Sequence, residues 1–242
     1  MRRVEFTNRR GEKLVGVLHG EPNGRAIVSC HGMLSGKDGV KHMRLAHELE
    51  RHDMPLLRFD FAGRGESEGD VFDMSYSNAI EDVDAAIDWL QKQGVTRVGL
   101  FGSSMGGAVA LLTAARDERV VTVATIAAIG YPSAIAERYP DQARAFEVQG
   151  FVDSPAGRIG RGFMDDAVQH DVVSAVAIVR APILVMHGTE DSVVPQTDAL
   201  DIASAAQNAT LDLVDGGDHQ FHDQQMLRPA MRRIAEFLVA HL

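Results

Sequence analysis

Short apolar runs alternate along the chain with longer segments in which apolar residues recur every three or four positions. Two runs near the start, Val4–Thr7 and Leu14–Leu18, flank a polar turn and predict a hairpin. Later runs suit strands covered on both faces, and we expect strands at 26–29, 55–59, 98–101, 120–129, 183–186 and 210–214.

Segments with helical spacing follow most of these runs. Helices are expected around 41–51, 80–90, 105–115 and 196–206, with a last one that places Leu227, Met231, Ile234 and Leu238 on one face. Ser77 is available to cap the helix around 80–90. Strands that alternate with helices predict an α/β fold with a mostly parallel sheet covered on both sides.

One region, from about 133 to 173, breaks this alternation. It is rich in charge and carries four glycines around two short apolar pairs, Phe151–Val152 and Phe163–Met164. Long irregular segments in a compact domain are more often lids or binding loops than accidents. We therefore expect a single domain over 1–242 with a small lid, part helix and part hairpin, inserted at about 133–173.

The charge balance excludes several partners. The chain of 242 residues carries a formal net charge of −10, whereas binding to nucleic acid or to an anionic membrane needs a basic face. Cys30 is the only cysteine, so no internal disulfide can form. The first residues lack the apolar run of a secretory signal, and no stretch reaches the roughly 18 apolar residues of a membrane helix. We expect a cytoplasmic protein that binds neither nucleic acid nor membrane.

Ser104 is the first candidate for chemistry. Gly102, Ser104 and Gly106 form G-x-S-x-G between the strand at 98–101 and the helix at 105–115. A glycine on each side lets the two backbones approach, while the serine takes a strained conformation with its hydroxyl held clear. Ser103 is the neighbouring alternative, but it does not fit this spacing.

A serine nucleophile needs a base, and the base needs an acceptor that holds its tautomer. Functional groups gather beyond the carboxyl ends of parallel strands. Two loops after Ser104 qualify, and they offer Asp191 as the acid and His219 as the base. Glu190 and His222 are the alternatives in the same loops.

Five segments together resemble the α/β-hydrolase superfamily. They are His31-Gly32, Asp60-x-x-Gly63-x-Gly65-x-Ser67, the turn from Gly102 to Gly106, His187-Gly188-x-x-Asp191-x-x-Val194-Pro195, and Gly217-x-His219. Their order, with Ser before Asp before His, is that of the superfamily. The resemblance implies an α/β-hydrolase fold with an eight-stranded, mostly parallel sheet.

The resemblance also implies an oxyanion hole made of the backbone N–H groups of Met33 and Met105. We expect Met33, His31 and Val194 to contact the substrate, although His31 also suits a structural role in supporting the oxyanion loop. Asp60, Gly63, Gly65 and Ser67 are expected to fix a turn under the site. No HGGG run is present, unlike in the lipases that use it.

Within the superfamily, Gly160-Arg161-Gly162-Phe163-x-x-Asp166-Ala167 resembles the insertion of feruloyl or cinnamoyl-type esterases. The hypothesis is a serine carboxylesterase that cleaves small or aryl esters through an acyl-enzyme intermediate. A thioesterase, an amidase or peptidase, and a non-catalytic binding protein are the alternatives. We expect a small-molecule ester substrate, no cofactor, no metal, and a monomer or homodimer.

Overall fold

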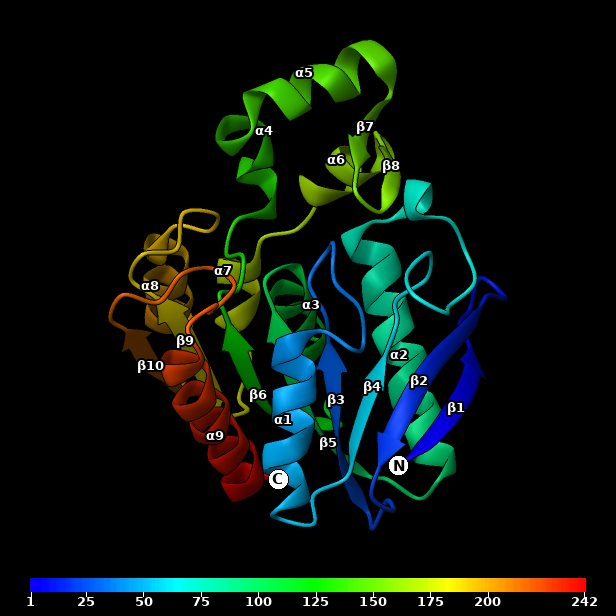
Figure 1. Ribbon diagram of the computed structural model, residues 1–242, viewed down its shortest axis with the longest axis vertical. Coiled ribbons are helices and arrows are strands. Elements are labelled where there is room, and N and C mark those ends of the chain that lie inside the picture. The colour runs from blue at the N-terminus through cyan, green and yellow to red at the C-terminus, as the bar shows by residue number, and fades with distance from the viewer.

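The computed structural model describes residues 1–242 and contains an eight-stranded sheet in the order β1-β2-β4-β3-β5-β6-β9-β10 (Figure 1). The strands are β1 (Arg2–Thr7), β2 (Lys13–His19), β3 (Arg25–Cys30), β4 (Leu56–Phe59), β5 (Arg97–Ser103), β6 (Val120–Ile126), β9 (Ile183–Gly188) and β10 (Ala209–Val214). Strands β1 and β2 form the predicted antiparallel hairpin, and β2 pairs antiparallel with β4. All other pairs are parallel, which confirms the mostly parallel α/β-hydrolase sheet.

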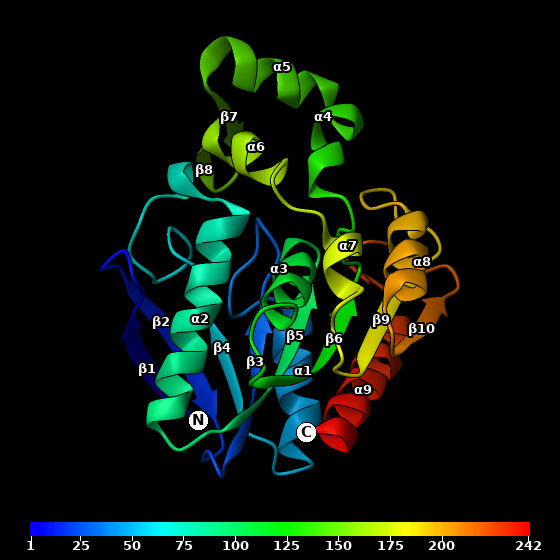
Figure 2. The same ribbon diagram turned by 180° about the vertical axis from the view of Figure 1, so that it is seen from behind.

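Helices cover both faces of the sheet. Helices α1 (Val40–Glu50) and α9 (Gln224–His241) lie side by side on one face, which is the near face in Figure 1. Helices α2 (Tyr76–Lys92), α3 (Met105–Ala114), α7 (Val172–Val176) and α8 (Gln196–Ala205) cover the opposite face (Figure 2). The predicted apolar face of the last helix is confirmed, because Leu227, Met231, Ile234 and Leu238 are fully buried. No helix is both long and apolar enough to span a membrane.

The order of the strands determines where a site can form. From β3 the chain moves to β4 on one side, and β5 then takes the place on the other side of β3. Helix α1, which follows β3, and helix α3, which follows β5, pack on opposite faces (Figures 1 and 2). The loops after these neighbouring strands therefore diverge, and such a switch point leaves a crevice at the carboxyl ends of the strands.

Two predicted boundaries are wrong. The apolar run 120–129 is a strand only as far as Ile126, because Ala127 takes a positive φ of 55° and turns the chain. Helix α2 begins at Tyr76, and its cap is Ser75, whose hydroxyl accepts a hydrogen bond from the N–H of Asn78 at 3.0 Å. Ser77 lies inside the first turn instead of capping the helix.

The segment between β6 and α7 forms a separate group of elements above the carboxyl ends of the strands (Figures 1 and 2). It contains a short 3₁₀ helix (Pro132–Ala134), α4 (Ile135–Arg138), α5 (Pro140–Gln149), the antiparallel hairpin β7 (Phe151–Ser154) and β8 (Gly157–Gly160), and α6 (Gly162–Ala167). We call residues 132–167 the insertion. It lies over the end of the sheet at which β5 passes into α3.

Candidate active site

Ser104 occupies the turn between β5 and α3. Its φ of 55° and ψ of −123° lie in a region that residues with a side chain rarely adopt. The turn is possible because its flanking residues are glycines. A Cβ on Gly102 would collide with the backbone of Gly106, and a Cβ on Gly106 would collide with the carbonyl groups of Cys30 and His31.

Ser104, His219 and Asp191 form a continuous hydrogen-bonded chain. The Oδ2 atom of Asp191 lies 2.7 Å from Nδ1 of His219, and Nε2 of His219 lies 3.2 Å from Oγ of Ser104. Because a carboxylate can only accept, Nδ1 carries the ring proton and Nε2 is left to accept from the serine hydroxyl. The three residues come from loops after β5, β9 and β10, and the structure brings all three together.

The Asp191 carboxylate is held in its ionised form. Burial acts to raise the pKa of Asp191, but the hydrogen bond from His219 and those from the N–H groups of Val194 and Val193 outweigh it, so the pKa is lowered. The two backbone bonds reach Oδ1, at 2.8 Å from Val194 and 2.9 Å from Val193. One carboxylate oxygen therefore anchors the loop and the other orients the imidazole.

The alternative residues lie elsewhere. The Glu190 side chain is exposed, and its backbone N–H bonds to the carbonyl of Gly217. His222 is paired with Asp218 at 2.6 Å on the surface. Ser103 is buried, and its hydroxyl accepts a hydrogen bond from Lys41. None of the three joins the chain that contains Ser104.

Two backbone N–H groups beside Ser104 are without a partner in the protein. Met105 is the first residue of α3, and Met33 lies in the loop after β3; neither N–H donates to another backbone or side-chain group. The N-terminus of a helix also carries a partial positive charge. Both groups are therefore available to a negatively charged oxygen, as the sequence predicts for an oxyanion hole.

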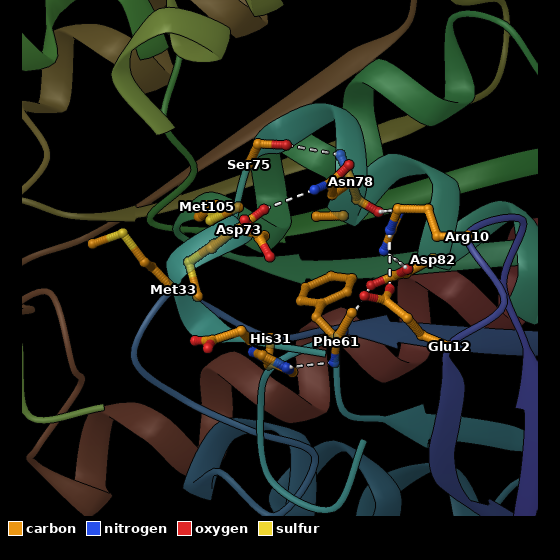
Figure 3. A pocket seen from close by; sticks show the side chains of 14 residues that line it. Arg10, Glu12, His31, Met33, Phe61, Asp73, Ser75, Asn78, Asp82 and Met105 are labelled. Carbon is orange, nitrogen blue, oxygen red and sulfur yellow. Dashed lines mark hydrogen bonds and ion pairs between the residues drawn. The ribbon is translucent and has the colours of Figure 1, made fainter. Parts of the chain in front are cut away.

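His31 supports the loop that contains Met33. Its Nε2 accepts from the N–H of Phe61 at 3.0 Å, so Nδ1 carries the proton and donates to the carbonyl of Gly32 at 2.8 Å. Burial lowers the pKa of His31 to about 4, so the ring is neutral. Figure 3 shows the imidazole directed toward the Phe61 backbone. His31 lies behind the loop and lines neither cavity beside Ser104, so its position fits the structural role and not substrate contact.

Asp60 ties the loop that contains Met33 to the turn at 63–67. Its carboxylate accepts from the N–H and the ammonium of Lys37, both at 2.7 Å, and from the N–H of Glu66 at 3.0 Å. The Ser67 hydroxyl donates to the Asp60 carbonyl at 2.6 Å. The Asp60 side chain is buried, so these bonds are shielded from water. This is the turn that the sequence predicts under the site.

Two cavities meet at Ser104. The first, of about 350 Å³, is mainly apolar and lies between the insertion and the sheet; Met33, Met105 and Val194 line it. The second, of about 510 Å³, has a mixed lining, in which His219, Gln220 and His222 lie beside apolar side chains such as Val40 and Phe221. Met33 and Val193 border both, so the serine lies between an apolar compartment under the insertion and a mixed compartment beside His219.

Several contacts that position the insertion have no signal in the sequence. Arg138 of α4 donates two hydrogen bonds, at 2.6 and 2.9 Å, to Asp198 of α8, which is fully buried. The Ser77 hydroxyl bonds Asp166, and His170 lies 3.1 Å from the same hydroxyl. Only the i,i+4 spacing of Asp166 and His170 suggests a local pair; Ser77 is 89 residues from Asp166 and 93 from His170 in the chain.

No group of three or more His, Cys, Asp or Glu side chains is arranged to hold a metal ion. His42 of α1 is buried against Ser29, with Nδ1 at 2.6 Å from the serine hydroxyl.

This chain resembles known hydrolases in sequence and in structure. A family model described as serine aminopeptidase, S33, matches residues 21–146. The mitochondrial palmitoyl-protein thioesterase ABHD10 of Mus musculus is 25% identical over 236 residues, which cover 93% of this chain and 76% of that protein. The thiohydrolase aneE of Aspergillus aculeatus is 34% identical over 143 residues, 57% of this chain and 45% of that protein. The structure of Est1E from Butyrivibrio proteoclasticus with bound ferulic acid has the same fold, with a TM-score of 0.83, 19% identity, and coverage of 98% of this chain and 99% of that chain.

Proposed function

The chain belongs to the serine aminopeptidase S33 family of the α/β-hydrolase superfamily, and within it we propose that the chain is a serine carboxylesterase acting on small or aryl esters. The observation that carries this proposal is the hydrogen-bonded chain from Asp191 through His219 to Ser104, with two unpaired N–H groups beside the serine. That combination supports the assignment of a nucleophile, a base and an oxyanion hole at one point.

In the proposed reaction, Oγ of Ser104 attacks the ester carbonyl while Nε2 of His219 takes the hydroxyl proton. The carbonyl π electrons move onto oxygen, and the N–H groups of Met33 and Met105 stabilise that negative charge. The C–O bond to the leaving alcohol then breaks as His219 returns the proton to it. A water molecule, deprotonated by His219, attacks the acyl-enzyme and releases the acid by the same steps.

The two cavities support one orientation of the substrate. The leaving oxygen receives its proton from Nε2 of His219, and His219 lines the mixed cavity but not the apolar one. The alcohol part therefore belongs in the mixed cavity, and the acyl part in the apolar cavity under the insertion. We propose that the substrate is an ester with an apolar acyl group.

The apolar cavity favours an ester over a peptide with a free N-terminus. An aminopeptidase needs a carboxylate that receives the terminal ammonium of its substrate. The only acidic residue lining this cavity is Asp153, which is exposed and already paired with Arg158 at 3.2 Å.

A thioesterase is the second candidate, because two of the matched relatives are named as a thioesterase and a thiohydrolase. The same chain of residues attacks either carbonyl, and a thiolate needs less help from His219 as it leaves. Ester and thioester substrates with one shared acyl group separate the two functions: a kcat/KM higher for the thioester by 10-fold or more would favour the second.

The first test is labelling with a fluorophosphonate probe, read by intact mass. Wild-type protein should gain one adduct, and folded Ser104→Ala should gain none. Ser103→Ala is the matched control and should keep the adduct. A folded wild-type protein that gains no adduct would contradict the proposal and favour a binding protein without catalytic activity.

The second test concerns acyl size. p-Nitrophenyl acetate and aryl esters should be cleaved with a higher kcat/KM than p-nitrophenyl esters of long-chain acids. A preference for the long chains would contradict the assignment of small or aryl acyl groups.

A further inference from the structure

Lys41 of α1 contacts the backbone of the proposed base and the residue before the proposed nucleophile. Its ammonium nitrogen lies 2.8 Å from the carbonyl oxygen of His219 and 3.2 Å from the hydroxyl oxygen of Ser103. An ammonium can only donate, so both oxygens accept from it. One buried cation therefore joins α1, the end of β5 and the loop after β10.

Burial of the Lys41 ammonium costs desolvation free energy. Lys41 is 7% exposed, and no carboxylate lies within ion-pair distance of its nitrogen. Burial lowers the pKa of Lys41 to about 8, against the weaker opposing attraction of Asp191 and Asp218. An apolar side chain would fill the same space without the cost of desolvating a charge.

We propose that Lys41 is a positioning residue for the reaction described above: its ammonium holds the backbone of His219 and so fixes the imidazole at Ser104. The inference rests on the proposed function. Its geometric basis is that the Asp191 bond restrains only one ring nitrogen of His219, whereas the Lys41 bond restrains the backbone from which the ring extends. The bond to Ser103 places the same restraint on the strand end that carries Ser104.

The rate of attack by Ser104 should depend on the strength of the hydrogen bonds that Lys41 donates. A displacement of about 1 Å between reacting groups lowers a rate by roughly 100-fold. A charged donor also makes a stronger hydrogen bond than a neutral amine. The charged or titratable groups around Lys41 are Asp191, Asp218, His219 and His222 from the two loops, and His42 on its own helix.

The experiment compares wild type with Lys41→Met, Lys41→Arg and Arg44→Met. Arg44 lies in the same helix, is only partly buried and has no hydrogen-bond or ion-pair partner, so Arg44→Met controls for loss of a cation from α1. The readouts are the rate of fluorophosphonate labelling and the kcat and KM for p-nitrophenyl acetate from pH 6 to 9.5. Thermal unfolding of each variant is followed alongside.

Lys41→Met should label roughly 10- to 100-fold more slowly at pH 7, with kcat reduced by a similar factor and KM within about twofold. Wild type should lose rate as pH rises through about 8, the pKa of Lys41. That decline should be missing in Lys41→Met and moved to higher pH in Lys41→Arg, which should recover part of the rate. Arg44→Met should match wild type throughout.

A folded Lys41→Met with the labelling rate and pH profile of wild type would overturn the inference, whatever its unfolding temperature, since a lysine that only packs would alter stability alone. If Lys41→Met does not fold, the pH profiles of wild type and Lys41→Arg test the inference. A wild-type rate that stays level to pH 9.5, or a decline that Lys41→Arg does not move, overturns it. A wild type that is never labelled overturns the proposed function and the inference with it.

Discussion

At Ser104 a residue with a side chain holds a φ of 55°, a conformation that costs on the order of 1–3 kcal/mol. The surrounding glycines make this conformation possible, because the carbonyl groups of Cys30 and His31 lie against Gly106. The strain directs the hydroxyl toward His219. Stability and activity are therefore linked at this turn.

Gly106→Ala tests that link. The added methyl group would collide with backbone atoms, which cannot move aside as the end of a flexible side chain can. We expect a loss of about 3 kcal/mol in the free energy of unfolding, measured by urea denaturation, or a failure to fold. Gly162→Ala is the matched control, since nothing lies within 4 Å of its new methyl group, and it should change stability by less than about 1 kcal/mol.

Asp191→Asn tests the tautomer of His219. An amide can donate to Nδ1, which moves the ring proton to Nε2 and leaves no acceptor for the Ser104 hydroxyl. We expect kcat to fall by roughly 1,000- to 10,000-fold with the fold intact. Glu190→Gln, one position away and exposed, should keep wild-type kcat; the opposite result would assign the acid to Glu190.

At the scale of elements, the insertion is tied to the sheet domain by a few polar contacts. The Arg138–Asp198 pair joins α4 to α8, and the Ser77 hydroxyl joins the start of α2 to Asp166 of α6. The Tyr139 hydroxyl also donates to the carbonyl of Val193, beside Asp191. These contacts determine the width of the apolar cavity, because Arg138, Tyr139 and Val193 all line it.

Arg138→Met should loosen the insertion. It leaves the Asp198 carboxylate buried with only the N–H of Gly130 as a partner, at 2.8 Å. Loss of one partner of a buried pair costs about 3–5 kcal/mol, and we expect a fall of that order with a higher KM for aryl esters. Arg158→Met removes an exposed pair in the same insertion and should cost less than about 1 kcal/mol. Urea denaturation of both variants, with KM for one aryl ester, checks this; equal losses would contradict it.

Most elements could be predicted because buried parallel strands give continuous apolar runs. The errors occur where burial alone does not define an element. Ala127 and Ala128 are as buried as the strand before them, yet a positive φ at Ala127 ends β6. Ser75 and Ser77 both satisfy the pattern of a cap, and the choice depends on where the preceding 3₁₀ turn (Val71–Asp73) ends.

The sequence predicts those residues of the candidate site that lie in loops directly after strands. Ser104, Asp191 and His219 each do, so the topology brings them together. Lys41 looks like an ordinary surface residue of an amphipathic helix, and its partner His219 is 178 residues away. Arg138 and Asp198 likewise meet across 60 residues, with no local pattern to pair them. Such contacts depend on tertiary packing, which the linear pattern does not contain.

For the whole molecule, buried neutral histidines predict a loss of stability in acid. Burial lowers the pKa of His31 to about 4 and that of His42 well below its usual range. In the unfolded chain both titrate near 6.5. Between about pH 6.5 and 4 the unfolded state therefore binds more protons, and the free energy of unfolding falls by up to about 1.4 kcal/mol per pH unit for each histidine.

Urea denaturation between pH 7 and 4.5 measures this slope. His42→Leu removes one of these groups and should make the slope less steep. His52→Gln changes an exposed histidine and should leave the slope as it is. An identical slope in wild type and His42→Leu would show that His42 contributes nothing to acid sensitivity.

The insertion follows β6 and ends before α7, the helix that returns the chain to the neighbouring strand β9. Its first and last elements, the 3₁₀ helix and α6, contact each other, so its two ends lie close together, and β6 and β9 pair directly without it. A segment attached in this way is an exchangeable module: a longer or shorter one could be grafted between β6 and α7 while Ser104, His219 and Asp191 stay where they are. Substrate range and catalytic residues could thus change independently in this fold. Replacement of the insertion would change the substrate range, and point substitutions would change the catalytic residues.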